Sequence, residues 1–377
     1  MASVGYSAAA APAAPTAGSS ASEKIKAVLN WQPGPGLKDI LGFTCQLSVM
    51  IKAGIDIRSA IEGIASQITK KSFRLIVEQI QHDLESGKSF SEALTRHRQV
   101  FSPLYINMVK ASELSGNFAA MLERVAAYQT QQVETRNMVI GAMIYPGIIA
   151  TMAVSCTTFL LTFVLPKFAL VFKGNEHLLP ASTTFLLNLS DFLRNYWYVP
   201  LGAVAVAAGA FRFWVRTDGG RRTWDRFKLR VPLMKKMFRA LYITRGIQTM
   251  GELVAAGVPM LDTLRITAEV SGNYLYRAMW MKVHEAVHDG GKIVTVLASN
   301  PLLPRNVVQM IAAGEESGSL AAVLQDVSEY YAKELKSTIK SVTSMMEPVM
   351  IVAMGGIVGF IAMSIILPIF KMSSMFK

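Results

Sequence analysis

The five residues HEAVH at positions 284–288 match the H-E-x-x-H pattern of zinc-metalloprotease helices. In that chemistry His284 and His288 lie one helical turn apart and ligate the metal, while Glu285 activates a water molecule as general base. The metzincin position for a third histidine, residue 294, is a valine. Whether these residues form a site therefore depends on the elements that position them.

The composition indicates a membrane protein. Of 377 residues, 51% are hydrophobic and only 17% are charged, and the mean hydropathy is +0.34. The net charge of +12 suits anionic lipid, nucleic acid or acidic partners. Cys45 and Cys156 are too few for a disulfide framework or a Cys-based zinc site, and we interpret both as small apolar packing residues. The Ala/Ser/Pro-rich residues 1–22 predict a disordered tail rather than a signal peptide.

Three segments are candidates for membrane spans. The uncharged runs at 138–166 and 348–370 are each longer than the roughly 20 helical residues that cross a bilayer core. A shorter segment at 196–215 begins with aromatic residues typical of the headgroup belt. Its Arg212 can snorkel to the interface, so we expect this segment to span as well.

The chain contains two copies of one unit. QLSVMIKAGIDIRSAI at 46–61 aligns with TMGELVAAGVPMLDTL at 249–264, and NMVKASELSGNF at 107–118 aligns with QMIAAGEESGSL at 309–320. Each copy consists of polar helices that run into one span. Because related units should have the same orientation, the chain must recross the bilayer between them, and 196–215 is the segment that can do so.

The residues that start and end helices predict an all-α fold. Gly54 ends one helix and Asp56 caps the next, SFSE at 89–92 is a capping box, and Gly116 ends a helix before Asn117, which can cap the following one. No stretch alternates as a strand does. We predict an all-α membrane protein with two homologous cytoplasmic bundles at 38–135 and 240–340, and three transmembrane helices at 138–166, 196–215 and 348–370.

Loop charge predicts the orientation. The segment 216–245 carries many Lys and Arg residues against Asp218 and Asp225, whereas the 174–193 loop has neither Lys nor Arg. The positive-inside rule then puts the N-terminus and both bundles in the cytoplasm and the C-terminus outside. We attribute the basic segment to this topology and to anionic lipid. No aromatic platform accompanies it, so we expect no nucleic-acid partner.

Two duplicated turns hold candidate functional residues. Glu113 and Glu315 end helices just before the glycines Gly116 and Gly318. An acidic side chain there opposes the helix dipole, so a basic side chain, a helix N-terminus or a partner should compensate it. We interpret these four residues and Glu316 as candidate partner-contact or structural-turn residues. Glu315 or Glu316 could be a third zinc ligand only if folding brings it close to HEAVH.

Pro146, Glu347 and Pro348 are candidate membrane-boundary residues. The two prolines correspond in the repeat, and each removes a backbone hydrogen bond and can kink its helix. A carboxylate at the depth of Glu347 is costly unless it lies at the interface or is paired. Glu347 therefore either marks the headgroup boundary or meets a partner in the membrane.

The turns AGIDIRSAI and AGVPMLDTL, the pair SELSGNF and GEESGSL, and the Leu-Pro span ends resemble the type II secretion F-domain family over about 38–377. The resemblance implies a polytopic inner-membrane platform protein of bacterial type II secretion systems or type IV pili. Such a platform couples a cytoplasmic hexameric ATPase to the addition of pilin or pseudopilin subunits. It implies no covalent chemistry and no cofactor. Other inner-membrane assembly proteins and further copies of the chain are the remaining implied partners.

The repeat also bears on the zinc-protease alternative. HEAVH at 284–288 corresponds to QHDLE at 81–85, so the first copy keeps the helix without the ligand set. What both copies keep is an apolar stripe at helical spacing. We therefore interpret HEAVH as part of a scaffold helix and assign no catalytic, cofactor-binding or metal-binding residue. A transporter, the third class, should have more spans and broken helices at mid-membrane.

Overall fold

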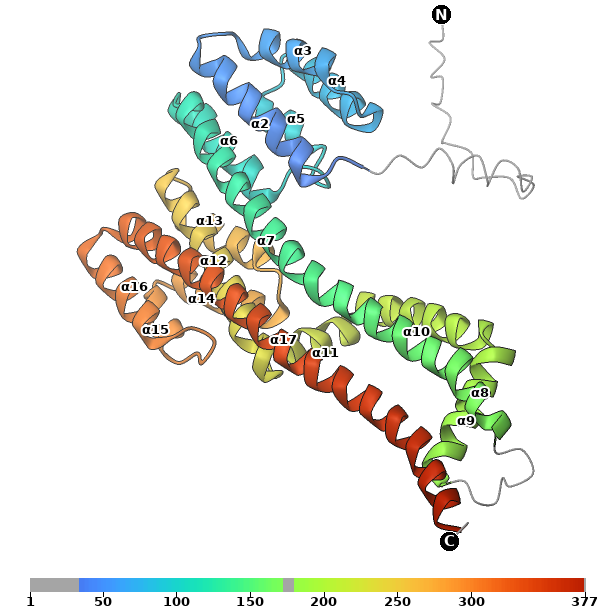
Figure 1. Ribbon diagram of the computed structural model, residues 1–377. Coiled ribbons are helices and arrows are strands. Elements are labelled where there is room, and N and C mark those ends of the chain that lie inside the picture. The colour runs from blue at the N-terminus through green and yellow to red at the C-terminus, as the bar shows by residue number, and fades with distance from the viewer. Residues whose placement is uncertain (1–33, 172–179, 376–377) are drawn as a thin grey trace, which may run out of the picture.

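The computed structural model describes residues 34–171 and 180–375, and every regular element within them is helical. The tail predicted at 1–22 lies outside the described residues. Two helical bundles lie at one end of the molecule, and an arm of long helices extends from them (Figure 1). This arrangement confirms the predicted all-α fold class.

The first bundle consists of five short helices and the start of a long one. Phe43 contacts Phe73 and Phe101 edge-on at ring distances of 6.0 Å, and these rings form the centre of the bundle's core. The helices are α2 (Leu37–Lys52), α3 (Ile57–Gln67), α4 (Lys71–Glu85), α5 (Phe90–Thr95), α6 (Pro103–Ser115) and α7 (Phe118–Phe159).

Local capping explains where these helices begin. Asp56 accepts a hydrogen bond from the amide of Arg58 at 3.0 Å, and Ser89 and Glu92 form the predicted capping box. Asn117 precedes α7, but its side chain makes no capping bond, contrary to expectation. Its backbone, at φ −99° and ψ 54°, lacks the extended conformation that aims an N-cap side chain at the first turn.

The second bundle repeats this order, which confirms the internal repeat. Its apolar core is separate from that of the first bundle and includes Trp280, Tyr276 and Ile311. Its helices are α12 (Pro232–Ala255), α13 (Met260–Val270), α14 (Tyr274–His288), α15 (Ile293–Ala298), α16 (Arg305–Ser317) and α17 (Leu320–Met375).

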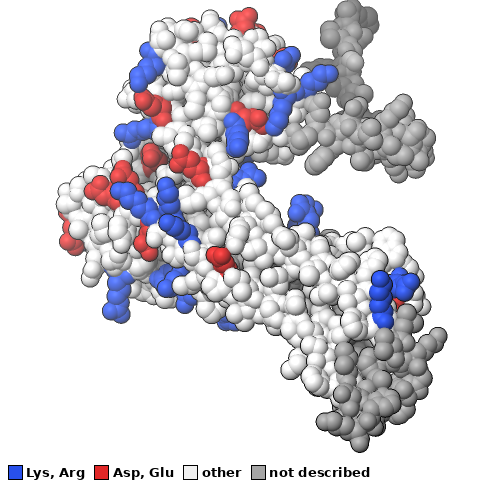
Figure 2. All heavy atoms as spheres, in the orientation of Figure 1, with Lys and Arg blue, Asp and Glu red and all other residues white. Residues whose placement is uncertain are grey.

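Within residues 34–171 and 180–375, three helices are long and apolar enough to cross a membrane: Phe118–Phe168, Tyr198–Arg216 and Leu320–Pro368. The first comprises α7, a π-helical turn η1 (Leu160–Val164) and the start of α8 (Leu165–Val171), and the second is α10 (Tyr198–Arg216). The arm that they form is almost free of charge, whereas the bundles carry Lys, Arg, Asp and Glu on their surfaces (Figure 2). The three spans predicted from the sequence are therefore confirmed as helices of suitable length and composition.

The connection between the first two spans contains a helix, α9 (Ala181–Asn195), where the sequence predicts only a loop. The Ser190 hydroxyl donates to the carbonyl of Leu161 at 2.5 Å, within the π-helical turn. Thr183 donates to the carbonyl of Ser364 on α17 at 2.6 Å. These are long-range contacts, invisible to local patterns, and they tie α7 to α17 at the ends far from the bundles.

The middle span reaches the second bundle through α11 (Asp218–Lys228). The buried carboxylate of Asp225 accepts hydrogen bonds from the Tyr274 amide at 3.0 Å and from the Lys228 ammonium at 3.1 Å. Its main-chain carbonyl accepts a further one from the Asn273 side chain. This carboxylate lies at the N-terminus of α14, where the helix dipole favours it. The end of the middle span is thereby fixed to the second bundle.

The two bundles touch through different faces. The first contributes its tail face, which we define as α6 and the start of α7, and the second contributes its head face, α12 and α13 (Figure 1). Leu253 and Ile266 of the head face are buried in the core of the first bundle. This apolar contact, together with the continuous helices, holds the bundles together.

A polar seam borders that apolar contact. The Tyr128 and Thr249 hydroxyls lie 3.4 Å apart, and the side chain of Gln248 donates to that of Gln131. The carboxyl of Glu252 is half-buried in the same seam, and burial raises its pKa, an effect that Arg124 partly offsets.

We predict that Glu252→Gln stabilises the folded chain at neutral pH. The folded-state pKa of Glu252 lies above the unfolded value of about 4.3. At pH values between these two pKa values, the folded chain therefore binds more protons than the unfolded chain. Its stability therefore falls as pH rises through that window, and the glutamine variant lacks this loss. Thermal unfolding in detergent should show a higher midpoint for the variant at neutral pH, converging on wild type toward about pH 4.

Glu316→Gln, at an exposed position of the same charge type, is the matched control and should change nothing. A difference between Glu252→Gln and wild type that is equal at both pH values would contradict this description of the seam.

Candidate functional site

HEAVH lies on the last turns of α14. Val283 beside it is buried, whereas His284 is half-buried and both Glu285 and His288 are exposed. His288 faces its neighbour Asp289 at 3.3 Å. Across residues 34–171 and 180–375, no three His, Cys, Asp or Glu side chains gather as a metal site would require. The features that both copies share lie elsewhere, at the paired turns and at the membrane boundary.

The Glu113 carboxylate turns back onto the first turn of α5. It accepts a hydrogen bond from the Ser91 amide at 3.0 Å and one from the Ser91 hydroxyl at 2.5 Å. The sequence raises the problem of an acid at the C-terminal end of a helix, and the N-terminus of α5 provides the compensation. A carboxylate at a helix N-terminus is favoured by the helix dipole and satisfies free amides.

Glu315 makes the equivalent contact in the second bundle. Its two oxygens accept from the amides of Ile293 and Val294 at 2.8 and 3.2 Å, at the start of α15. The N-cap residue Lys292 offers no side-chain acceptor, so Glu315 caps α15 without help from a capping box. In both copies the glutamate links the end of one helix to the start of another.

The glycines after these glutamates have a conformational role. Gly116 and Gly318 both have φ +71°, the left-handed conformation that ends a helix and that side chains rarely adopt. Glu316 is exposed, unlike the half-buried Glu315 beside it. Of the three glutamates at these turns, Glu113 and Glu316 are exposed, and the Glu113 carboxylate is occupied by Ser91.

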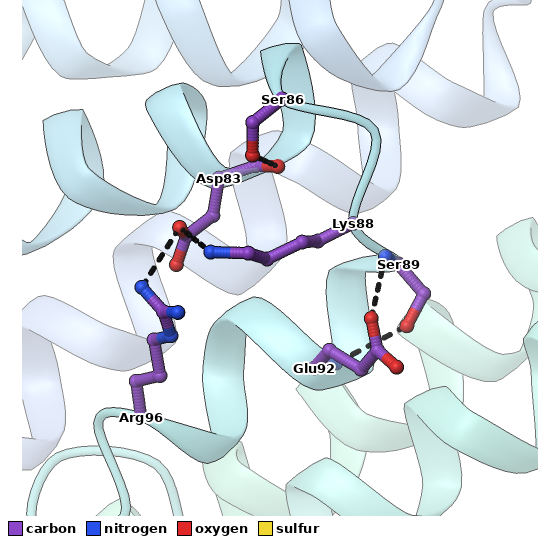
Figure 3. Close-up of polar contacts among 6 residues, drawn as sticks. All are labelled: Asp83, Ser86, Lys88, Ser89, Glu92 and Arg96. Atoms are coloured by element: carbon purple, nitrogen blue, oxygen red, sulfur yellow. Dashed lines mark hydrogen bonds and ion pairs between the residues drawn. The ribbon is translucent and has the colours of Figure 1, made fainter. Parts of the chain in front are cut away.

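The first bundle adds a charge network at the turn before α5. The buried carboxylate of Asp83 accepts from Lys88 at 2.6 Å and from Arg96 at 3.0 Å, beside the Ser89–Glu92 capping box (Figure 3). The bond from Lys88 lowers the pKa of Asp83 below its usual value, despite burial. The second copy has Ala286 at the position of Asp83, so this network is particular to the first bundle.

At the predicted membrane boundary the two copies meet. The Tyr145 hydroxyl donates to the Glu347 carboxylate at 3.0 Å, and these two residues occupy equivalent positions of the repeat. Glu347 is therefore paired across the spans, which lowers the cost of a carboxylate at that depth. α7 and α17 continue without a break through Pro146 and Pro348.

A groove runs between α7 and α17 on the bundle side of this pair. Glu134 and Met138 line it from α7, and Lys333, Lys336 and Ile339 are among the residues that line it from α17. It has charges of both signs above an apolar floor. Such a surface suits reversible contact with a protein segment better than it suits chemistry on a small molecule.

Comparison with known proteins identifies the family. Residues 43–166 and 247–368 match the family described as type II secretion system (T2SS), protein F. The type IV pilus assembly protein PilC of Thermus thermophilus is 37% identical over 340 residues, covering 90% of this chain and 83% of the relative. The type II secretion system protein F of Aeromonas hydrophila is 31% identical over 359 residues, covering 94% and 92%.

The chain belongs to the type II secretion system protein F family. The matched segments are the two copies of the repeat, each with its span. The family resemblance of the repeated turns is thus confirmed, and relatives carry the names of both type IV pilus and type II secretion components.

Sequence reasoning missed three parts of this arrangement. The contacts of Glu113 and Glu315 with α5 and α15 join residues more than 20 positions apart and have no local signal. The polar seam between the bundles has no local sequence signal either. The pairing of Tyr145 with Glu347 did have one, because the repeat alignment equates the two positions and both face the membrane boundary.

We predict that Glu315→Ala destabilises the chain by about 1–2 kcal/mol, because the free amides at the start of α15 lose their acceptor. Glu113→Ala should cost less, since the Ser89–Glu92 capping box still serves α5. Thermal unfolding of the purified chain measures both values.

Glu316→Ala is the matched control and should leave stability unchanged. If Glu315→Ala matches wild type in stability and expression but abolishes assembly, the carboxylate acts on a partner, and the capping account is wrong.

Proposed function

We propose that this chain is an inner-membrane platform that scaffolds the assembly of pilin or pseudopilin fibres, in type IV pilus biogenesis or type II protein secretion. It couples that assembly to a cytoplasmic hexameric ATPase. One observation carries the proposal: two copies of the family's bundle each continue through a single helix into a membrane span. The names of the relatives, which denote pilus assembly and secretion components, support it.

Continuous helices suit mechanical coupling. α7 and α17 each begin in a bundle and continue into the arm, and at 1.5 Å per residue α17 is roughly 80 Å long. A displacement imposed on a bundle therefore reaches its span without passing through a flexible linker. α9 joins the two spans at their far ends, so they move together.

Loop charge supports the orientation with the N-terminus and both bundles in the cytoplasm and the C-terminus outside. The region around α11 supports contact with anionic lipid. Trp224 lies against Phe211 of the middle span at 5.0 Å and stacks on Phe227 at 5.5 Å, and exposed arginines flank these rings. Aromatic rings with adjacent arginines suit the headgroup layer of an anionic leaflet.

The ionisable groups at the paired turns support a role without covalent chemistry. Glu113 and Glu315 are occupied by backbone amides, and Asp83 by two cations. ATP hydrolysis then comes from the partner ATPase. The platform holds its partners in place, with the fibre subunits in the membrane on one side and the ATPase on the other.

Chemical cross-linking in native membranes tests this proposal. We expect exposed lysines of both bundles, such as Lys110 and Lys282, to link to the hexameric ATPase, because both lie on the cytoplasmic side. Lys167, exposed on α8 at the opposite end of the arm, should not link to it. Mass spectrometry of the linked peptides identifies the partners. Links from Lys167 to the ATPase, or none from either bundle, would contradict the proposal.

A further inference from the structure

The repeat leaves two faces of the chain without a counterpart. The tail face of the first bundle meets the head face of the second. The second bundle has the equivalent tail face, formed by α16 and the start of α17. The first bundle has the equivalent head face, α2 and α3. Among the described residues these two faces do not meet within one chain.

Exposure of equivalent tail-face residues shows how different their surroundings are. Tyr128 on α7 is 7% exposed, whereas its counterpart Tyr330 on α17 is 57% exposed. The second tail face thus carries a large aromatic side chain in water.

The free head face also exposes apolar side chains. Val49 on α2 is 68% exposed and Ile55 in the following turn is 39% exposed. Their counterparts, Glu252 and Val258, lie at the contact between the bundles. Thr249 there is fully buried, whereas its counterpart Gln46 is exposed. Exposed apolar side chains gathered on a bundle surface commonly mark a protein contact.

We propose that the tail face of the second bundle of one chain packs on the head face of the first bundle in a second copy, repeating the contact that joins the two bundles within a chain. The occupant is another copy because the matching face already exists on this same molecule. The proposal depends on the repeat and the interbundle contact, and it does not require the proposed function to be correct.

The repeated contact gives specific pairs. Tyr330 would meet Gln46, as Tyr128 meets Thr249, and an aromatic hydroxyl can bond an amide as readily as a hydroxyl. Lys333 would lie beside Cys45, as Gln131 lies beside Gln248. The electrostatic attraction between Arg124 and Glu252 is not reproduced, since the counterparts are Asp326 and Val49.

The membrane restricts how copies can be related. All spans must remain in one bilayer, so copies are related by rotation about its normal. A contact between two different faces is heterologous, and it forms a closed ring when the rotation between neighbouring copies is a whole fraction of a full turn. A ring of chains would present alternating first and second bundles around one axis.

Cysteine cross-linking in membranes tests the proposal, because native Cys45 already lies on the head face. In a chain with Cys156→Ser, the substitution Lys333→Cys should give a disulfide-linked dimer on oxidation, seen on a non-reducing gel. A second pair, Gln46→Cys with Tyr330→Cys in a chain lacking both native cysteines, should do the same. Gln131→Cys with Gln248→Cys is the internal control and should form an intrachain disulfide, detected by mass spectrometry.

Leu75→Cys, on α4 outside both faces and 59% exposed, is the matched negative control with Cys45 retained. We expect several-fold less dimer from it than from Lys333→Cys. The proposal is overturned if the internal control forms while both test pairs stay monomeric. It is also overturned if the Lys333→Cys dimer survives Cys45→Ser, which would indicate a tail-to-tail contact. Dimer that appears only after residues 1–33 are deleted would assign the head face to the chain's own N-terminal segment.

Discussion

The continuity of α7 and α17 is the constraint on which the rest of this structure depends. Each helix contributes to a bundle core in its first turns and then becomes a membrane span, with no break between. The apolar residues that fix the helix in its bundle therefore also set the direction of the span. Tyr145 and Glu347 meet at the predicted membrane boundary because both bundles impose the same geometry on equivalent positions.

The two copies of the repeat within one chain contact each other in two different ways. At the boundary, equivalent residues pair with each other, whereas the bundles meet through unlike faces, tail to head. Duplication of one unit therefore produced a molecule with an internal interface. The head face of the first bundle and the tail face of the second do not take part in it. A half-buried glutamate, one pair of hydroxyls and one pair of glutamine side chains line that interface beside its apolar centre, so it combines specificity with a modest cost of burial.

Much of the fold follows from sequence pattern. Uncharged runs predict the spans, the repeat predicts two bundles, and caps such as Asp56 and Ser89 mark helix starts because their effects are local. α9 could not be predicted in this way, since Ser190 and Thr183 gain their partners only when the spans have assembled. The roles of Glu113 and Glu315 were open for the same reason: each carboxylate is explained by amides of another helix, which sequence spacing does not reveal. Asn117 shows the converse, a suitable residue type whose backbone conformation prevents capping.

The central claim is that a bundle and its span act as one rigid unit during assembly. It is tested most directly by placing a short Gly-Ser insertion in α17 between Ile339 and Glu347, in a strain whose only copy is the variant. The account predicts normal membrane insertion and ATPase binding, with loss of fibre formation or secretion. The same insertion after Arg230, between α11 and α12, should be tolerated, because the chain is not helical there. Full assembly with the α17 insertion would contradict the account.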